Sequence, residues 1–396
     1  MTTRDTSQIN VTSTAPGTAA GDYLRQFWQP VAFSVDLDVK RPRRVKILGE
    51  ELTLYRDQAG GAHLVDGSCA HRGARLSLGW IEPDGLRCRY HGWKYDFSGQ
   101  CIDQPAEVRS FAKKMCIRSF RTVERYGVIF ALLAPRSNAP FIEMFGRDDL
   151  DPSSGVHFAH FSMIRSYNYF QDLENLVDSS HVPFLHGQSA FRGTERAGSD
   201  AAPVESEIAT ISAEETEYGL LETSSSPGGV ARSILYTMPN AVYFRTCADR
   251  RFMDLESAIW VVPIDDDSHM FYSVTSIAPD QADILERARM AEAHCATVGR
   301  DALHRQLDEL VRAVLDGSKS IEEVKQRPMS VHIEDCIVQA SQGVVHGRAN
   351  EHLGESDRAM SLLRRLWKRE LEAQAQGRPP TSFREPPRLP RGVYAI

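Results

Sequence analysis

Long hydrophobic runs are missing from this chain of 396 residues. No apolar stretch is long enough to span a bilayer, and the first residues, Met-Thr-Thr-Arg-Asp-Thr-Ser-Gln, lack the apolar segment of a secretory signal. Cysteine is also scarce. The chain has 7 cysteines, which are scattered and do not form the dense framework of a disulfide-rich secreted domain. These absences predict a soluble, cytoplasmic protein.

An excess of basic residues is lacking as well. The chain has 46 Lys and Arg residues against 53 Asp and Glu residues, which gives a formal net charge of −7. Binding to nucleic acid or to an anionic membrane surface would need a basic patch or stripe. We therefore expect neither partner.

The first third of the chain has the pattern of a small β domain. After a polar arm and a short helix expected at 22–29, short apolar runs alternate with turn residues. The expected strands are 44–48, 51–55, 62–65, 86–90, 94–97 and 128–133. Prolines at 135 and 140 mark a boundary, so we predict one domain over 1–140 and a second over 141–396.

The second region mixes strands and helices. A meander of an antiparallel sheet is expected from four runs, 233–236, 241–246, 255–262 and 270–277. Helical periodicity predicts one helix over 281–315 and another from about Ser356 towards Gly377. The predicted fold class is α+β, with a small all-β domain followed by a larger α+β domain.

Two short loops in the β region each carry one cysteine and one histidine. They read Cys69-Ala-His71-Arg-Gly and Cys88-Arg-Tyr-His91-Gly-Trp. Two thiolates and two imidazoles suit a [2Fe–2S] cluster in which two histidines replace two cysteines on one iron. Zinc also binds two cysteines and two histidines, but its usual spacings place the cysteines together and the histidines together. The order of the ligands therefore favours an iron–sulfur cluster.

A second polar cluster reads Asn175-Leu-Val-Asp178-Ser-Ser-His181-Val-Pro183-Phe-Leu-His186. The first three named residues are spaced by three and would share one face of a helix. Pro183 should bend or end that helix, so that the two imidazoles converge. Two histidines and one carboxylate form the ligand set of non-haem iron(II) oxygenases. The alternative is a structural role for two histidines near a helix end.

The residues alone leave the third ligand open. Asp178 shares the predicted face of His181, and a distant stretch offers Glu334 and Asp335. Any of these carboxylates could complete the set.

The two motifs together resemble those of a known family. Cys-x-His-Arg-Gly followed by Cys-x-Tyr-His-Gly-Trp is similar to the Rieske signature of ring-hydroxylating oxygenases. Asn-x₂-Asp-x₂-His-x₄-His followed by a distant aspartate resembles the catalytic domain of the phthalate 4,5-dioxygenase and O-demethylase type. Similar segments at 20–31 and 351–357 extend the resemblance over nearly the whole chain. It implies a helix-grip-like catalytic domain.

The resemblance also implies roles for individual residues. His181, His186 and Asp335 would bind a mononuclear Fe(II), with Glu334 as the rival carboxylate. Asp178 would form a hydrogen-bonded bridge from a Rieske histidine of a neighbouring subunit to His181.

Asn175 would lie near the iron without binding it, beside the residues that do. Members of the family form head-to-tail trimers, so the resemblance implies a homotrimer.

The predicted function is that of a terminal oxygenase component, which activates O₂ at the iron and oxidises an aromatic substrate by ring hydroxylation or O-demethylation. The chain has no Cys-x₄-Cys-x₂-Cys run and no Gly-x-Gly-x-x-Gly loop. Its electrons should therefore come from a separate NAD(P)H-dependent reductase with flavin and ferredoxin-type centres. The alternative is a Rieske electron-transfer protein whose second domain is a non-catalytic partner-binding module.

The substrate is less well specified. Four arginines lie in or near the predicted sheet, namely Arg232, Arg245, Arg250 and Arg251. One of them could clamp a substrate carboxylate bidentately. The alternative, which the sequence favours, is that most of them are solvated surface cations. We expect an aromatic, carboxylated substrate.

Overall fold

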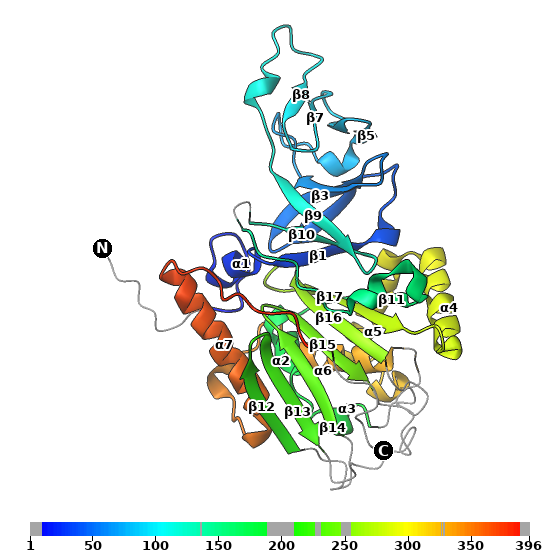
Figure 1. Ribbon diagram of the computed structural model, residues 1–396, viewed down its shortest axis with the longest axis vertical. Coiled ribbons are helices and arrows are strands. Elements are labelled where there is room, and N and C mark those ends of the chain that lie inside the picture. The colour runs from blue at the N-terminus through cyan, green and yellow to red at the C-terminus, as the bar shows by residue number, and fades with distance from the viewer. Residues whose placement is uncertain are drawn as a thin grey trace. The chain divides into compact units, whose positions relative to one another are not determined.

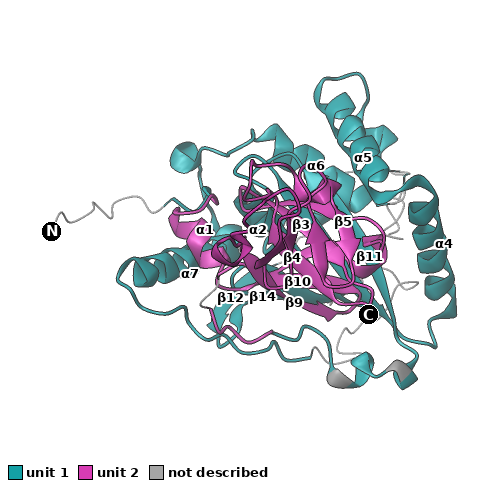
Figure 2. Cartoon of the chain, turned by 90° about the horizontal axis from the view of Figure 1, so that it is seen from above, with its two compact units in different colours: residues 1–13, 142–396 teal, residues 14–141 magenta. Residues whose placement is uncertain are grey.

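The computed structural model describes residues 10–134, 137–187, 210–225, 231–246, 255–325, 327 and 329–388. The chain divides into two compact units, an N-terminal unit at Thr14–Phe141 and a C-terminal unit at Ile142–Ile396, with Met1–Ser13 grouped with the latter (Figure 2). No helix in the described ranges is long and apolar enough to cross a membrane.

The arm before Thr14 is held by the C-terminal unit. Tyr169 donates its hydroxyl to the carbonyl of Val11 at 2.7 Å, and Asn168 Nδ2 donates to the carbonyl of Thr12 at 2.8 Å. The predicted domains, 1–140 and 141–396, instead assign this arm to the first domain.

The N-terminal unit is built from two antiparallel sheets (Figure 1). The larger sheet has the order β1-β10-β9-β4-β3-β2, and the smaller has the order β5-β6-β7-β8. The elements are α1 Ala19–Leu24, β1 Trp28–Phe33, β2 Arg43–Ile47, β3 Glu50–Arg56, β4 Ala62–Asp66, β5 Trp80–Glu82, β6 Gly85–Arg87, β7 Lys94–Tyr95, β8 Cys101–Asp103, β9 Ser119–Arg125 and β10 Val128–Leu132.

The start of this unit differs from the prediction. The helix expected at 22–29 ends at Leu24, and β1 begins at Trp28 and contains Pro30. β1 is an edge strand whose pairing with β10 shifts register between Pro30 and Ala32. An edge strand with an irregularity tolerates proline because no ladder hydrogen bond depends on its missing N–H.

The two Cys/His loops repeat one backbone turn. In each loop the cysteine N–H donates to the carbonyl five residues later at 2.8 Å. The glycine four residues after the cysteine donates back to the cysteine carbonyl, at 2.9 Å in the Cys69 loop and 3.1 Å in the Cys88 loop. Gly73 and Gly92 have φ of +72° and +77°, which glycine adopts without steric cost. The shared turn explains why a glycine stands four residues after each cysteine in the sequence.

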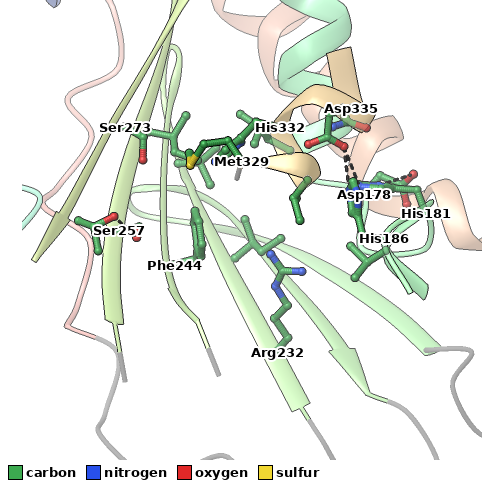
Figure 3. Close-up of a pocket in the computed structure, with 18 of the residues that line it drawn as sticks. Asp178, His181, His186, Arg232, Phe244, Ser257, Ser273, Met329, His332 and Asp335 are labelled. Carbon is green, nitrogen blue, oxygen red and sulfur yellow. Dashed lines mark hydrogen bonds and ion pairs between the residues drawn. The ribbon is translucent and has the colours of Figure 1, made fainter. Parts of the chain in front are cut away.

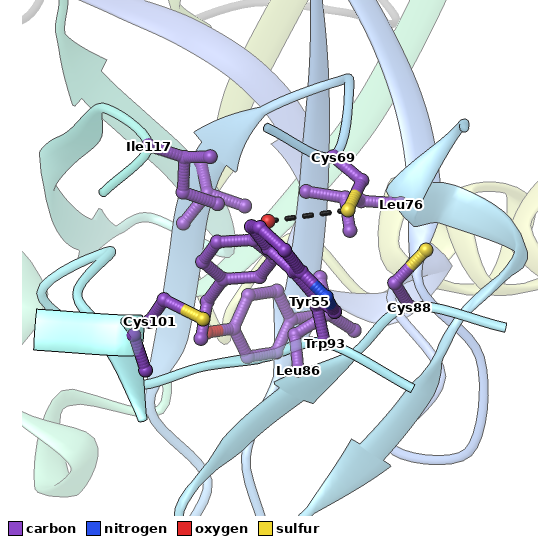
Figure 4. Close-up of a cluster of buried hydrophobic side chains, with 11 residues drawn as sticks. Tyr55, Cys69, Leu76, Leu86, Cys88, Trp93, Cys101 and Ile117 are labelled. Carbon is purple, nitrogen blue, oxygen red and sulfur yellow. Dashed lines mark hydrogen bonds between the residues drawn. The ribbon is translucent and has the colours of Figure 1, made fainter. Parts of the chain in front are cut away.

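Both loops rest on one hydrophobic core (Figure 4). Cys69 and Cys88 are themselves part of this cluster, together with Leu76, Leu86 and Trp93. The cysteine thiols are therefore placed by packing as well as by the turns.

The C-terminal unit is a seven-stranded antiparallel sheet with helices packed on it (Figure 1). The strand order is β11-β17-β16-β15-β14-β13-β12. The strands are β11 His157–Arg165, β12 Thr210–Thr216, β13 Gly219–Ser225, β14 Ala231–Thr237, β15 Ala241–Thr246, β16 Leu255–Pro263 and β17 His269–Ile277. The helices are α2 Tyr169–Leu176, α3 Val182–Leu185, α4 Ala282–Val298, α5 Arg300–Leu315, α6 Ser330–Ser341 and α7 Arg358–Ala375.

The predicted meander corresponds to β14–β17, and the α+β fold class is confirmed. The strands at β11, β12 and β13 were not predicted. The single helix expected over 281–315 is two helices, because Gly299 adopts φ +87° between α4 and α5. β16 is buried at every position, including its polar residues Glu256 and Ser257.

Two helices connect the sheet to the second polar cluster of the sequence. α2 packs on β16, and α6 packs on both α2 and α5. One face of α6 is core, since Ile333, Cys336 and Ile337 pack with Met163 and Leu310. The other face is therefore turned away from that core.

The repeated turn predicts different tolerance of alanine at its two glycines. A Cβ on Gly92 would lie 2.7 Å from Pro105 Cγ, whereas a Cβ on Gly73 would meet nothing within 4 Å. Both substitutions force a left-handed φ at about 1–2 kcal/mol, so we expect Gly92→Ala to lower the free energy of unfolding by more than Gly73→Ala. Urea denaturation followed by the visible absorbance of the cluster checks this order. Equal losses in the two variants would contradict it.

Candidate metal centres and active site

The four predicted cluster ligands come together at the tips of the two loops. The thiols of Cys69 and Cys88 are buried, and the rings of His71 and His91 lie 4.6 Å apart between centroids. Tyr95 holds its hydroxyl 3.1 Å from Cys69 Sγ. Burial raises the pKa of the Cys69 thiol, and the nearby Cys88 raises this pKa further. The hydroxyl of Tyr95 lowers it, but not by enough to cancel the rise. Two adjacent buried thiols need a cation if both are to be thiolates.

The histidine side of this site is fixed by stacking. The ring of His71 stacks on Trp93 with 4.6 Å between centroids and 5° between planes. Its Nδ1 atom is buried and has no hydrogen-bond partner among the described residues. An unpartnered buried nitrogen is costly, and a metal bond would satisfy it. These residues fit a [2Fe–2S] cluster with two thiolate and two imidazole ligands.

The second polar cluster lies in the C-terminal unit, in a different local structure from the one predicted. α2 ends at Leu176, before the histidines, and Pro183 lies in the first turn of the separate helix α3. Proline is tolerated there because the first N–H groups of a helix have no intrahelical partner. The predicted role of Pro183 as a helix terminator is therefore wrong. His181 precedes α3 and His186 follows it, so this one turn of helix separates them.

Three predicted ligands converge at this point. His186 Nε2 lies 3.0 Å and His181 Nε2 lies 3.5 Å from Asp335 Oδ1. One ligand atom from each of the three residues lies within 4.8 Å of the others. Two imidazoles and one carboxylate on one side of an ion leave other coordination positions open.

Glu334 and Asp335 are neighbours in α6 but have different partners. Glu334 is fully buried, and its Oε2 lies 2.8 Å from His186 Nδ1. Asp335 instead faces the Nε2 atoms of both histidines. Burial alone would raise the pKa of Asp335, but hydrogen bonds from the two imidazoles outweigh it and hold this pKa well below its usual value. Asp335 is therefore an anion at neutral pH.

Asp178 lies on the opposite edge of His181. Its Oδ2 is 3.6 Å from His181 Nδ1, which is an ion-pair distance and not a hydrogen bond. Burial opposes ionisation of Asp178, but the neighbouring His181 and Ser180 outweigh it and lower the pKa of this carboxyl. Burial likewise disfavours the charged form of His181, yet Asp178 and Asp335 raise its pKa to about 9. A cation binding to His181 must therefore displace a proton.

Asn175 lies on the last turn of α2 and lines the cavity that opens beside the three converging residues. It is buried, and its Oδ1 accepts a hydrogen bond from Gln339 Nε2 at 3.0 Å. This bond ties α2 to α6, the helix that carries Asp335.

A cavity of ≈ 440 Å³ opens beside the three converging residues (Figure 3). Its wall is mainly apolar, with Ile234, Val242, Phe244 and Ile259 from the sheet strands. A mostly apolar cleft of this size with a few polar groups is typical of a small-molecule site. The polar lining residues beyond the ligand cluster include Arg232, Ser257, Ser273, Thr275 and His332.

The four arginines considered from the sequence have different surroundings. Arg232 lines the cavity, with its guanidinium carbon 5.7 Å from the Phe244 ring centroid. Arg245 is buried and paired with Glu256, so it was wrongly considered a surface cation. Arg250 and Arg251 lie outside the described residues.

Sequence reasoning missed two polar residues of this region. His332 lies one helical turn before Asp335, and the period of α6 could have shown that both share a face. Glu222 is fully buried in β13 and accepts a hydrogen bond from Ser179 at 3.0 Å. Burial raises its pKa to about 7, although the bond from Ser179 opposes this shift. No local motif marks Glu222, because only the pairing of β13 places it there.

Comparisons with known proteins match one family model and several oxygenase subunits. The family model described as "Rieske [2Fe-2S] domain" matches residues 27–122. The chain is 28% identical over 388 residues to the phenoxybenzoate dioxygenase subunit alpha of Ectopseudomonas oleovorans, covering 93% of this chain and 86% of that one. It is 26% identical over 395 residues to the 5,5'-dehydrodivanillate O-demethylase oxygenase subunit of Sphingobium sp., covering 96% and 82%.

A solved structure supports the fold over both units. The structure titled "Pseudomonas putida CBB5 NdmA with caffeine" matches with a TM-score of 0.64 at 22% identity, covering 91% of this chain and 94% of that one. The predictions of fold class, enzyme class and cofactors, a [2Fe–2S] cluster and a mononuclear non-haem iron, are confirmed at the level of the class. The chain thus carries a Rieske domain and acts as an oxygenase, and it is similar along more than nine-tenths of its length to the oxygenase subunits of an aromatic dioxygenase and an O-demethylase.

Proposed function

We propose that His181, His186 and Asp335 hold the mononuclear iron of this oxygenase. The observation that carries the proposal is the convergence of their ligand atoms within 4.8 Å beside a cavity. With iron bound there and electrons arriving from the Rieske cluster, this centre supplies the activation of O₂ that oxidises an aromatic substrate by ring hydroxylation or O-demethylation.

The carboxylates behind the histidines orient the ligands. Glu334 accepts the Nδ1–H of His186, which fixes the tautomer and leaves Nε2 free to face the centre. Asp178 faces Nδ1 of His181 in the same way at a longer distance. Asn175 links α2 to α6 through its hydrogen bond with Gln339, and so fixes the position of α6, which carries Asp335, relative to α2.

The metal content of the protein tests this assignment. We expect wild type to bind two cluster irons plus one further iron, and His181→Ala to keep the cluster irons and lose the other. Glu334→Gln should weaken binding of the single iron by about 10- to 100-fold, as expected for an outer carboxylate. Iron analysis measures the total iron per chain, and the red-brown absorbance measures the cluster.

Glu292→Gln is the matched control, because Glu292 also faces a histidine, His157 at 3.1 Å, but outside the cavity. Full substrate turnover in His181→Ala would sink the assignment. Wild type with cluster irons only would favour the alternative of a plain electron carrier, for which the comparisons give no support.

We further propose that electrons come from a separate NAD(P)H-dependent reductase with flavin and ferredoxin-type centres, and that the chain acts in the cytoplasm as a homotrimer. In that trimer Asp178 would bridge between His181 and a Rieske histidine of the neighbouring subunit. The position of Asp178 on the outer edge of His181, with 3.6 Å between the two groups, supports this role. A sedimentation mass of one or two chains would contradict the trimer.

Asp178→Asn tests the bridge. The amide keeps the shape but removes the charge, so we expect both metals to stay bound and product formation in a single turnover to fall about 10- to 100-fold. The variant is reduced with dithionite, freed of the reductant and mixed with O₂ and substrate. Asp316→Asn, a change in an exposed turn after α5, serves as the control. Normal turnover in Asp178→Asn would refute the bridge.

The substrate class we propose is an aromatic carboxylic acid. An apolar cavity suits an aromatic ring, and Arg232 offers a planar guanidinium for a carboxylate within that cavity. The relatives named for phenoxybenzoate and 5,5'-dehydrodivanillate are consistent with such a substrate.

Single turnovers with benzoate and methoxybenzoates test the substrate class and separate the two reactions. Formaldehyde release identifies O-demethylation, and hydroxylated product without formaldehyde identifies ring hydroxylation. We expect Arg232→Gln to weaken binding of the acids by about tenfold or more, since a charge-assisted hydrogen bond contributes about 1.5–3 kcal/mol. Arg232→Lys should recover only part, because a lysine cannot bind bidentately.

Methoxybenzene is the control ligand, whose binding Arg232→Gln should leave unchanged. Failure of every acid to give product would overturn the substrate class. Unchanged affinity of the acids for Arg232→Gln would remove Arg232 from the site.

A further inference from the structure

His332 is a histidine in the cavity wall that the iron site does not use. It lies on α6 three residues before Asp335, so both side chains are on the helix face that lines the cavity (Figure 3). The core of the unit takes other positions of α6, Ile333, Cys336 and Ile337. His332 is therefore a residue of the substrate cavity.

Two aromatic rings hold the imidazole in a fixed orientation. The ring of His332 stacks on Phe161 with 4.9 Å between centroids and 20° between planes, and lies 5.1 Å from the ring of Phe271. The stacked Phe161 covers one face of the imidazole, while the Phe271 ring is tilted by 57° against it, so the ring edge that carries the nitrogens is open to other contacts.

No described residue hydrogen-bonds to His332, whose only ring contacts are the two phenylalanines. The His332 side chain is half-buried, so an occupant that displaces water from the cavity would leave the imidazole without a partner unless it supplied one, whereas a leucine or phenylalanine would pack between these rings without that penalty. A polar side chain here is explained if the occupant of the cavity supplies the partner. Burial, with the nearby Arg165, lowers the pKa of His332 to about 4. At neutral pH the ring thus offers one N–H donor and one nitrogen acceptor, and no charge.

We propose that His332 is a specificity-determining residue that forms a hydrogen bond with an uncharged oxygen of the substrate, such as an ether, hydroxyl or carbonyl oxygen. The inference rests on the proposed function, in which Arg232 holds the carboxylate of the same molecule. The substrate is then an aromatic acid with a second oxygen-containing group. His332 recognises that group one helical turn from the iron ligand Asp335.

Pairs of ligands that differ in one oxygen test the proposal. Anaerobic calorimetry on the holoenzyme gives dissociation constants for 3- and 4-methoxybenzoate and for the matching ethylbenzoates, in which a methylene replaces the ether oxygen. We expect wild type to bind at least one methoxy acid about five- to tenfold more tightly than its ethyl partner, the range of one neutral hydrogen bond. His332→Phe should abolish this preference, and His332→Gln should retain part of it.

The Arg232→Gln variant separates the inference from the proposed function. It should weaken the methoxy and ethyl acids equally and leave their ratio unchanged. If His332→Phe does not fold, as judged by cluster absorbance and iron content, His332→Leu replaces it. A preference that survives in the folded His332 variant, or that wild type lacks, overturns the role of His332 while the role of Arg232 stands. Failure of wild type to bind any of these acids overturns both.

Discussion

The catalytic unit depends on one shared carboxylate. Asp335 Oδ1 faces the Nε2 atoms of two imidazoles, at 3.0 and 3.5 Å, although the histidines and the aspartate are about 150 residues apart in the chain. The contact joins α6 to the turn around α3. It can form only because the opposite face of α6 is buried in the core and fixes the rotation of the helix. The position of Asp335 is thus set by the packing of α6 in the core of the unit.

Negative charge around the two histidines exceeds what they neutralise. Asp178, Glu334 and Asp335 all lie against the pair, and Glu334 is fully buried with its Oε1 unpartnered among the described residues. Buried carboxylates are unfavourable unless positive charge compensates them. A divalent cation bound at the proposed iron site would provide that charge. The same arrangement places the outer carboxylates on the Nδ1 edges of the imidazoles, where they orient the rings.

The cavity divides its polar groups between two elements. Arg232 lies on β14 and His332 on α6, and apolar strand residues line the space between these polar groups. An arginine recognises charge, and a neutral imidazole recognises an oxygen without charge. Two groups of different chemistry fix a ring more selectively than either alone, because the wrong isomer leaves one of them unpaired. In the proposed function the iron would determine the class of reaction, and this pair would determine which ring enters.

The candidate cluster ligands Cys69, His71, Cys88 and His91 could be identified from the sequence because each pair lies within one short turn, whose hydrogen bonds depend on local spacing alone. The histidines of the second centre were predictable in identity but not in geometry, since Pro183 begins a helix instead of ending one. The family resemblance favoured Asp335 over Glu334, and only the tertiary structure showed that they contact different edges of the histidine rings. It also brought His332 to the cavity and Glu222 to Ser179. Adjacent residues of a helix point about 100° apart, and packing of α6 against α2 and α5 decided that Asp335 faces the Nε2 atoms of both histidines while Glu334 contacts Nδ1 of His186.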